Sequence, residues 1–506
     1  MKKTILVSLT LVTALILVCN SLSAIELLKG KTLYMQAQNL EKKADYFNAL
    51  ELYKQARQEL LKEDDIALAD QCRQACTRMI KITLTYTHTE EEMRKMIKEK
   101  YPDTSDERID QVIADGRLAH LEIGGETYYF DHFLNTLYHI YPDFMTEEAK
   151  GALGKMGKIF DIMSQYLYEK DDIPSWQTLS SPLTFEFDAY LSIPRDSFPD
   201  EGVLRVWMPL PLSNSSQTDI VIESICSEEY IPYPAQLDGD IGYVYYEFPL
   251  EEIQDSIRIG AKFSYTSYEV RFNVHPEKVG EYDKTSLLYK QYTASDKNIA
   301  ITPEIIRTAR KIAGDEKNPY LIAKKFYDHI VYDLDYSYMP HVALEALKIP
   351  ESVFVHEHGY GDCGAQSMYF SALCRAVGIP ARASGGMQLF PLSAAHCGDH
   401  FWAHIFMPNY GWIPVDTSVG QAAKYIITIT KEQQTDFIEY FFGNIDPFRY
   451  LIQVDVDVPL EPAPEEPLLF GMVLQAPTAE CMEMDENPGL LFMEYWKISC
   501  KEVSQP

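Results

Sequence analysis

Three residue types that together perform thiol chemistry occur in order along the chain. Cys363 stands in Gly361-Asp362-Cys363-Gly364 at the start of a segment with helical spacing, and His400 and Asp416 follow on segments with the alternation of strands. A thiol becomes a strong nucleophile when an imidazole takes its proton and a carboxylate orients that imidazole. A helix N-terminus and a nearby imidazolium both favour the thiolate. The spacing therefore predicts an activated thiol at Cys363.

The helix that would carry Cys363 has a defined start and end. Glycines before it permit a tight turn, Tyr369 and Leu373 lie on one apolar face, and Gly378-Ile379-Pro380 ends it. Backbone N–H groups at such a helix start could also bind a developing oxyanion.

The histidine that acts as the base has more than one candidate. His400 and His404 are separated by an even number of residues on one predicted strand, so both would point to the same face. Asp416 lies at the end of the returning strand, after the turn at 408–411. His396, in a loop rich in small residues, is a third candidate. Spacing alone leaves the choice open.

A family resemblance narrows this choice. The segments that carry it are Gly361-Asp362-Cys363, Gly378-Ile379-Pro380-Ala381-Arg382, His400-Phe401-Trp402 and Gly411-Trp412-Ile413-Pro414-Val415-Asp416. Over roughly residues 285–420 they resemble the transglutaminase-like superfamily. The resemblance implies a papain-like fold with Cys363, His400 and Asp416 as its catalytic triad, and His404 as a neighbour. The later segment 442–449 is also similar to segments of bacterial relatives.

Further residues receive expected roles beside the triad. Trp402 is expected to form a wall of the cleft, and Arg382 is expected to be a structural ion-pair partner. The resemblance implies that Tyr332 is placed where an aromatic residue can assist the oxyanion. Cys374 and Cys397 are interpreted as buried thiols, with disulfides as the alternative. No cluster has the ligand spacing of a zinc site, so neither a metal nor another cofactor is expected.

The surrounding chain reads as a multidomain α+β protein. Residues 25–175 are predicted to be α-helical, and the segment 44–56 resembles the second half of a tetratricopeptide unit. Residues 174–182 read as a linker, 183–275 as a β-sandwich and 285–425 as the catalytic core. The tail, 426–506, has a proline-rich linker followed by strand-like segments at 468–474 and 490–500. It is predicted to be a small C-terminal β extension.

Composition and the N-terminus limit partners and location. The net charge of -30 over 506 residues argues against nucleic acid, which requires basic patches. Lys2 and Lys3 precede an apolar run at 5–18 and small residues up to Ala24, which predicts a signal peptide, 1–24, and export to the periplasm, the cell surface or the medium. Cys19 offers lipidation, and with it membrane attachment, as the alternative.

These features predict an exported thiol-dependent acyl-transfer enzyme that acts on peptide or carboxamide bonds of a protein or peptide. Hydrolysis is favoured because no calcium-binding loop is visible in the sequence. A protein cross-linking transferase is the first alternative. A catalytically silent module that binds proteins through its N-terminal helices is the second.

Overall fold

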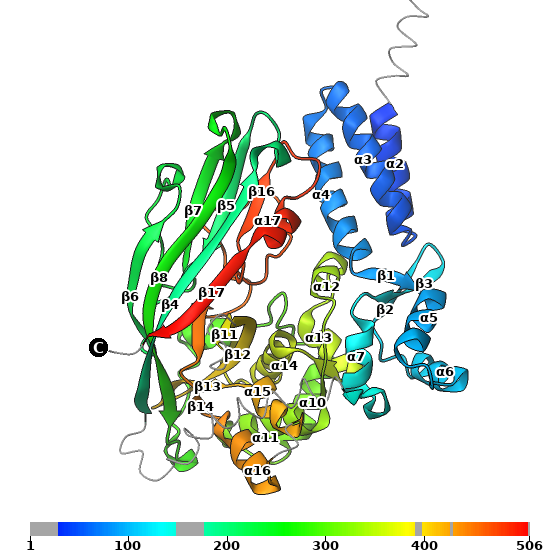
Figure 1. Cartoon of the computed structure of the whole chain (residues 1–506). Coiled ribbons are helices and arrows are strands. Elements are labelled where there is room, and N and C mark those ends of the chain that lie inside the picture. The colour runs from blue at the N-terminus through cyan, green and yellow to red at the C-terminus, as the bar shows by residue number, and fades with distance from the viewer. Residues whose placement is uncertain (1–28, 148–176, 390–396, 426–428, 504–506) are drawn as a thin grey trace, which may run out of the picture. The chain divides into compact units, whose positions relative to one another are not determined.

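The computed structural model describes residues 29–147, 177–389, 397–425 and 429–503 (Figure 1). The signal peptide predicted at 1–24, Cys19 and His396 lie outside these residues, as do residues 174–176 of the linker predicted at 174–182. The chain divides into two compact units, one of residues 1–96 and 119–131 and one of residues 97–118 and 132–506. Each is described by itself.

The first unit combines helices with a small sheet. The helices are α2 (Lys29–Glu41), α3 (Tyr46–Lys62), α4 (Ile66–Thr83) and α5 (Glu90–Lys100), whose last residues belong to the second unit. The strands are β1 (Tyr86–Thr89), β2 (His120–Ile123) and β3 (Glu126–Phe130), in the order β1-β3-β2. Small and aromatic side chains at helical spacing, such as Ala49, Tyr53 and Ala56, are buried where α3 packs between α2 and α4.

The sheet corrects the expectation of an entirely helical region at 25–175. β2 and β3 form a hairpin whose connection is Gly124 and Gly125, with φ of 62° and 90°. Two consecutive glycines with positive φ match the twist of a two-residue hairpin, and Tyr128 and Tyr129 favour a strand after it.

The second unit contains a β-sandwich, seen as the long green and red strands of Figure 1. Its strands are β4 (Gln177–Pro194), β5 (Val203–Pro209), β6 (Gln217–Ile225), β7 (Tyr243–Pro249), β8 (Ser256–Phe272), β14 (Asn444–Ile445), β16 (Thr478–Cys481) and β17 (Lys497–Val503). One sheet has the order β14-β8-β4-β17, with β6 also paired to β8, and the other has the order β16-β5-β7. Alternate residues of both sheets, including Phe187, Val206 and Phe263, enclose one apolar core.

The end of the chain completes this sandwich, which corrects the expectation of a separate C-terminal β extension. β16 pairs with β5, and β17 pairs with β4 along seven registered residue pairs from Lys497–Tyr190 to Val503–Thr184. Residues 468–474 form no strand, and 490–500 divides into α17 (Gly489–Tyr495) and the start of β17. The linker predicted at 174–182 is also wrong in part, because β4 begins at Gln177 and pairs with β8 from there.

The core joins helices to a second sheet. The helices are α6 (Asp106–Asp115), α7 (Phe133–Ile140), α9 (Leu287–Tyr292), α10 (Pro303–Ala313), α11 (Pro319–Asp333), α12 (His341–Leu347), α13 (Glu351–His358), α14 (Cys363–Ala376), α15 (Thr417–Ala422) and α16 (Lys431–Tyr440). The strands β11 (Ala381–Leu389), β12 (Cys397–Met407), β13 (Gly411–Val415) and β15 (Arg449–Gln453) pair in the order β13-β12-β11-β15. β9 (Asp335–Tyr336) pairs in parallel with β10 (Tyr360–Gly361).

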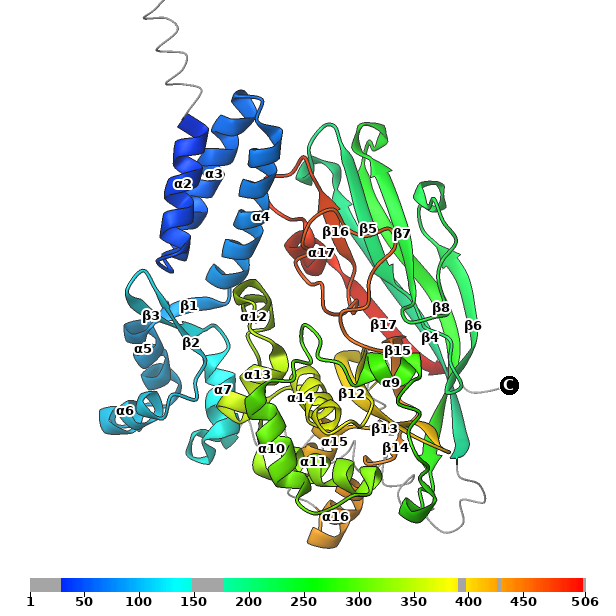
Figure 2. The ribbon, with the colours of Figure 1, turned by 180° about the vertical axis from the view of Figure 1, so that it is seen from behind.

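α14 is the central helix of the core and packs against β11 and β12. Its residues from Gly364 to Arg375 are buried. The reverse view shows α9 near the sheet, where Tyr292 packs edge-on against Trp412 of β13 with 4.9 Å between ring centroids (Figure 2). Across the parts of the chain that the structure describes, no helix combines the length and apolarity needed to cross a bilayer.

Candidate active site

Cys363 is the first residue of α14 and lies beside the strand that carries His400. Asp362 caps the helix by accepting the backbone N–H of Ala365 at 3.0 Å. The next residue, Gly364, faces the ring of Phe401, and a Cβ added there would lie 3.2 Å from the nearest ring carbon. Glycine at this position therefore lets the start of α14 approach β12 closely.

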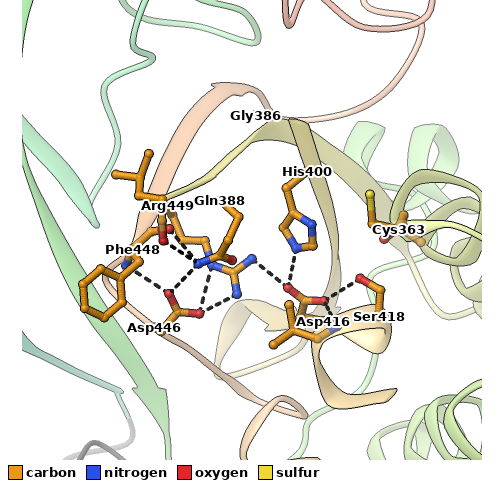
Figure 3. Close-up of polar contacts among 12 residues, drawn as sticks. Cys363, Gly386, Gln388, His400, Asp416, Ser418, Asp446, Phe448 and Arg449 are labelled. Atoms are coloured by element: carbon orange, nitrogen blue, oxygen red, sulfur yellow. Dashed lines mark hydrogen bonds and ion pairs between the residues drawn. The ribbon is translucent and has the colours of Figure 1, made fainter. Parts of the chain in front are cut away.

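His400 and Asp416 form a buried pair at adjacent ends of β12 and β13 (Figure 3). Nε2 of His400 lies 2.8 Å from Oδ2 of Asp416, and the two residues are 7% and 0% exposed. Asp416 is also the cap of α15, because its Oδ1 accepts the N–H of Val419 at 2.9 Å and the hydroxyl of Ser418 at 3.1 Å. The carboxylate thus fixes the imidazole and the helix start together.

Figure 3 shows Asp416 below the imidazole of His400 and Cys363 to one side of it, with the second ring nitrogen of His400 on the side of Cys363. The three side chains come from α14, β12 and the residue before α15, so sheet pairing and helix capping set their placement. His404, on the same face of β12, bonds instead through Nδ1 to the hydroxyl of Ser384 at 2.9 Å. Burial, with Arg382 nearby, lowers the pKa of His404 well below its usual range, which leaves this imidazole neutral.

The electrostatics around the thiol differ from the expected activation by a helix start. Burial raises the pKa of Cys363 well above its usual range, and the carboxylates of Asp362 and Asp416 add to this effect. The backbone N–H groups of Phe401 and Gly364 act in the opposite direction but do not outweigh it. The resting thiol is therefore protonated, and its activation requires a base.

A second histidine neutralises the carboxylate next to the thiol. His341 lies between two carboxylates, with Nε2 2.6 Å from Oδ2 of Asp362 and Nδ1 2.8 Å from Oε1 of Glu351. Burial alone would lower the pKa of His341, but the two carboxylates outweigh it and raise that pKa well above its usual range. Residues 341, 351 and 362 share no recognisable motif, so the sequence alone does not indicate this group.

The aromatic residue near the thiol is Tyr336, which corrects the expectation for Tyr332. Tyr332 is 50% exposed, and its ring lies below the ammonium of Lys424 at 5.9 Å. Tyr336 pairs with Gly361 through β9 and β10 and interacts electrostatically with Cys363 and Asp362. Burial, reinforced by these groups, raises the pKa of its hydroxyl, so the hydroxyl remains a hydrogen-bond donor. Two residues of β9 are too short a strand signal to be found in a sequence.

Trp402 lines a cavity of about 190 Å³ between the core sheet and the sandwich. His404, Trp412, Arg382 and Ser267 lie on its other walls. No carboxylate lies within salt-bridge distance of Arg382 in the described residues, and its guanidinium instead stacks on the ring of Trp412 at 4.2 Å and interacts with Tyr292. The expected ion-pair role of Arg382 is therefore wrong, because an aromatic platform holds the guanidinium.

Arg449 of β15 is a further site residue that spacing did not reveal. Its Nη1 donates to Oδ2 of Asp416, the same oxygen that contacts His400, and Arg449 is 5% exposed. Its segment was noticed only through its similarity to relatives, and nothing in its residue types indicates a partner 33 positions earlier. In the described part of the chain, no three His, Cys, Asp or Glu side chains converge as a metal site would require.

Comparison with known proteins identifies the core. Residues 306–417 match the family model described as the transglutaminase-like superfamily, a range that includes Cys363, His400 and Asp416. This segment of the chain belongs to that superfamily. Its transglutaminase-like core is embedded in a mixed helix and sheet protein, and no curated protein matches the chain.

Solved structures resemble the chain only distantly. A Cytophaga hutchinsonii protein described as a candidate cysteine protease aligns with a TM-score of 0.40 at 12% identity, over 65% of this chain and 94% of its own. The periplasmic domain of TgpA from Pseudomonas aeruginosa aligns with a TM-score of 0.23 at 11% identity, over 52% of this chain and 98% of its own. A candidate protease from Parabacteroides distasonis aligns with a TM-score of 0.19 at 11% identity, over 57% of this chain and 49% of its own. Since these TM-scores lie below 0.5, the functional argument rests on the transglutaminase-like core itself.

Proposed function

We propose that this protein is an exported thiol-dependent hydrolase that cleaves peptide or carboxamide bonds through a thioester with Cys363. The observation that carries the proposal is the buried pair of His400 and Asp416, 2.8 Å apart, with Cys363 facing the imidazole. A protonated thiol needs a base, and we assign that role to His400, whose second ring nitrogen lies on the side of Cys363.

The reaction follows from the order of these groups. His400 takes the proton of Cys363 as Sγ forms a bond to the carbonyl carbon, whose oxygen becomes an oxyanion. The imidazolium, fixed by Asp416, then gives this proton to the leaving amine as the carbon–nitrogen bond breaks. Water, deprotonated by His400, attacks the thioester and releases the acid and the thiol.

We assign to the hydroxyl of Tyr336 the role of hydrogen-bond donor to the oxyanion. It stays protonated in its buried position beside Cys363, so it can donate a hydrogen bond when negative charge develops. Asp362 occupies the N–H of Ala365 at the start of α14, which leaves fewer backbone donors there.

The first experiment measures alkylation of Cys363 by iodoacetamide in the wild type, Cys363→Ala and His400→Ala. We expect iodoacetamide to modify one reactive thiol in the wild type that is absent from Cys363→Ala. At neutral pH, the rate of this modification should be about 10²-fold or more higher in the wild type than in His400→Ala. Equal rates in wild type and His400→Ala, with both proteins folded, would contradict an activated thiol.

A second experiment separates hydrolysis from transfer. Denatured casein is incubated with the enzyme and a fluorescent primary amine, and both peptide release and amine incorporation are measured. Hydrolysis predicts new peptides or released ammonia with little incorporated amine, and loss of both in Cys363→Ala. Predominant amine incorporation would instead establish a cross-linking transferase.

Export is proposed from the N-terminal sequence, with its basic residues followed by an apolar run. Mass spectrometry of the mature protein tests it. A new N-terminus close to residue 25 supports cleavage, whereas a lipid-modified Cys19 would establish the alternative.

A further inference from the structure

The carboxylate of Asp416 is held from two sides. Its Oδ2 accepts a hydrogen bond from Nη1 of Arg449 at 2.7 Å and is 2.8 Å from Nε2 of His400 (Figure 3). Its Oδ1 accepts from Ser418 and Val419. Each oxygen therefore has two partners, and movement of Asp416 away from His400 would break several bonds at once.

Arg449 is itself fixed by a second buried carboxylate. Its Nη2 and Nε lie 2.5 and 3.1 Å from Oδ2 of Asp446, and its guanidinium carbon is 5.3 Å from the centroid of the Trp402 ring. Asp446 also accepts the backbone N–H of Phe448 at 3.0 Å. The result is a chain of contacts from Asp446 through Arg449 and Asp416 to His400.

The charges of Asp446, Arg449 and Asp416 sum to one net negative charge next to the imidazole. Asp416 and Asp446 are 0% and 1% exposed, and a single guanidinium lies between them. Two buried carboxylates without a cation would repel each other, and the loss of one partner from a buried ion pair is strongly destabilising. Burial alone would raise the pKa of Asp416, but His400 and Arg449 hold that pKa well below its usual range.

We propose that Arg449 is a positioning residue of the reaction, which locks Asp416 in contact with His400 and limits the charge that the carboxylates present to the imidazole. This inference rests on the proposed function of the triad. It adds a role for a residue of β15, outside the segment that matches the family model.

The direction in which Arg449 shifts the pH dependence of the reaction follows from the groups that face the pair of His400 and Asp416. These are Cys363 of α14, Tyr327 of α11, Tyr336 of β9, Arg449 of β15 and Asp446 before that strand. Removal of a nearby cation makes an acid–base group hold its proton to higher pH, whether that group is a thiol or an imidazole. Removal of a nearby carboxylate does the opposite.

The test compares Arg449→Gln, Arg449→Lys and Asp446→Asn by the pH dependence of Cys363 alkylation, which requires no known substrate. We expect Arg449→Gln to slow alkylation at pH 7 about 10- to 100-fold. In the plot of alkylation rate against pH, the fall of the rate toward low pH (the acid limb) should move upward by about one pH unit in this variant. Arg449→Lys should recover part of the rate, and Asp446→Asn should move the acid limb downward.

The matched control is Arg375→Gln. Arg375 is another buried arginine of the core, 3.1 Å from Asp455, and it contacts none of the triad residues. We expect this variant to lose stability but to keep the wild-type acid limb. An unchanged limb in folded Arg449→Gln or Asp446→Asn, or an equal shift in Arg375→Gln, would overturn the role of Arg449. Equal alkylation of wild type and His400→Ala would instead overturn the proposed function.

Discussion

Single residues around Cys363 control whether its thiol can react. The thiol is partly buried and interacts electrostatically with two carboxylates, each of which has its own cationic partner, His341 for Asp362 and Arg449 for Asp416. Neutralisation of both carboxylates is a requirement for forming a thiolate there, because a second negative charge in a buried site is costly.

The alkylation rate of wild-type Cys363 should rise with pH. The pKa of this thiol is raised by burial, so the reactive anion is lost as pH falls below that pKa. We expect slow labelling at pH 5 and faster labelling toward alkaline pH, measured by mass spectrometry of the Cys363 peptide. Labelling that is fastest at pH 5 would show a thiolate already present there.

His341→Gln is predicted to slow that labelling and to destabilise the fold. The variant leaves Asp362 without a cation beside the thiol, and a loss of several-fold in rate at pH 7 is expected. Because the folded pKa of His341 is raised, its contribution to stability is fully present below the unfolded pKa of about 6.5. That contribution is lost only as pH rises through the folded value.

Urea unfolding at several pH values measures this contribution. The difference in the free energy of unfolding between wild type and His341→Gln should be largest below about pH 6.5 and shrink in alkaline solution. A difference that grows with rising pH would contradict the charged state assigned to His341.

At the scale of elements, the contact of α14 with β12 brings the nucleophile to its base. Gly364 is the residue that permits it, since a Cβ at this position would lie only 3.2 Å from the ring of Phe401. The helix and the strand belong to different parts of the sequence, so their approach depends on packing rather than on local spacing.

Gly364→Ala is predicted to slow the alkylation of Cys363. This effect, expressed as a change in activation free energy, should be larger than the loss in the free energy of unfolding. The new methyl group must displace the Phe401 ring by a few tenths of an ångström, at a cost of about 1 kcal/mol. The double variant Gly364→Ala, Phe401→Leu should regain part of the rate. Gly471→Ala, where the nearest atom is 3.4 Å away in Glu345, is the control for a glycine replacement without a clash.

At the scale of the whole molecule, the last strand is structural. β17 covers the edge of β4 and places Cys500 against the sandwich core, beside Cys397 at the start of β12. A free edge as long as β4 would be a template for pairing with other chains.

Deletion of residues 497–506 is therefore predicted to lower the thermal midpoint markedly and to cause aggregation, as measured by calorimetry and light scattering. Lys501→Ala is the control, because it removes only an exposed ion pair with Glu186. A truncated protein as stable and monodisperse as the full chain would contradict this role of β17.

The sequence predicts local elements better than their partners. Alternation at Leu204–Met208 and the helical spacing after Cys363 depend on near neighbours, and both elements are present as β5 and α14. The pairing of β17 with β4 and the contact of Arg449 with Asp416 join distant segments, for which a single sequence has no signal. Only the family resemblance pointed to Tyr332, and Tyr336 gave no signal of its own, because a strand of two residues leaves no alternation to read.

The pairing of Ser499 with Asp188, 311 positions apart, also has a consequence for biosynthesis. During translation the segment with Cys363, His400 and Asp416 emerges before Arg449 and well before β16 and β17. Until those residues leave the ribosome, the sandwich lacks two strands and Asp416 lacks its guanidinium partner. The order of synthesis thus delays completion of the site until β15 has been made, and completion of the sandwich until β17 has been made.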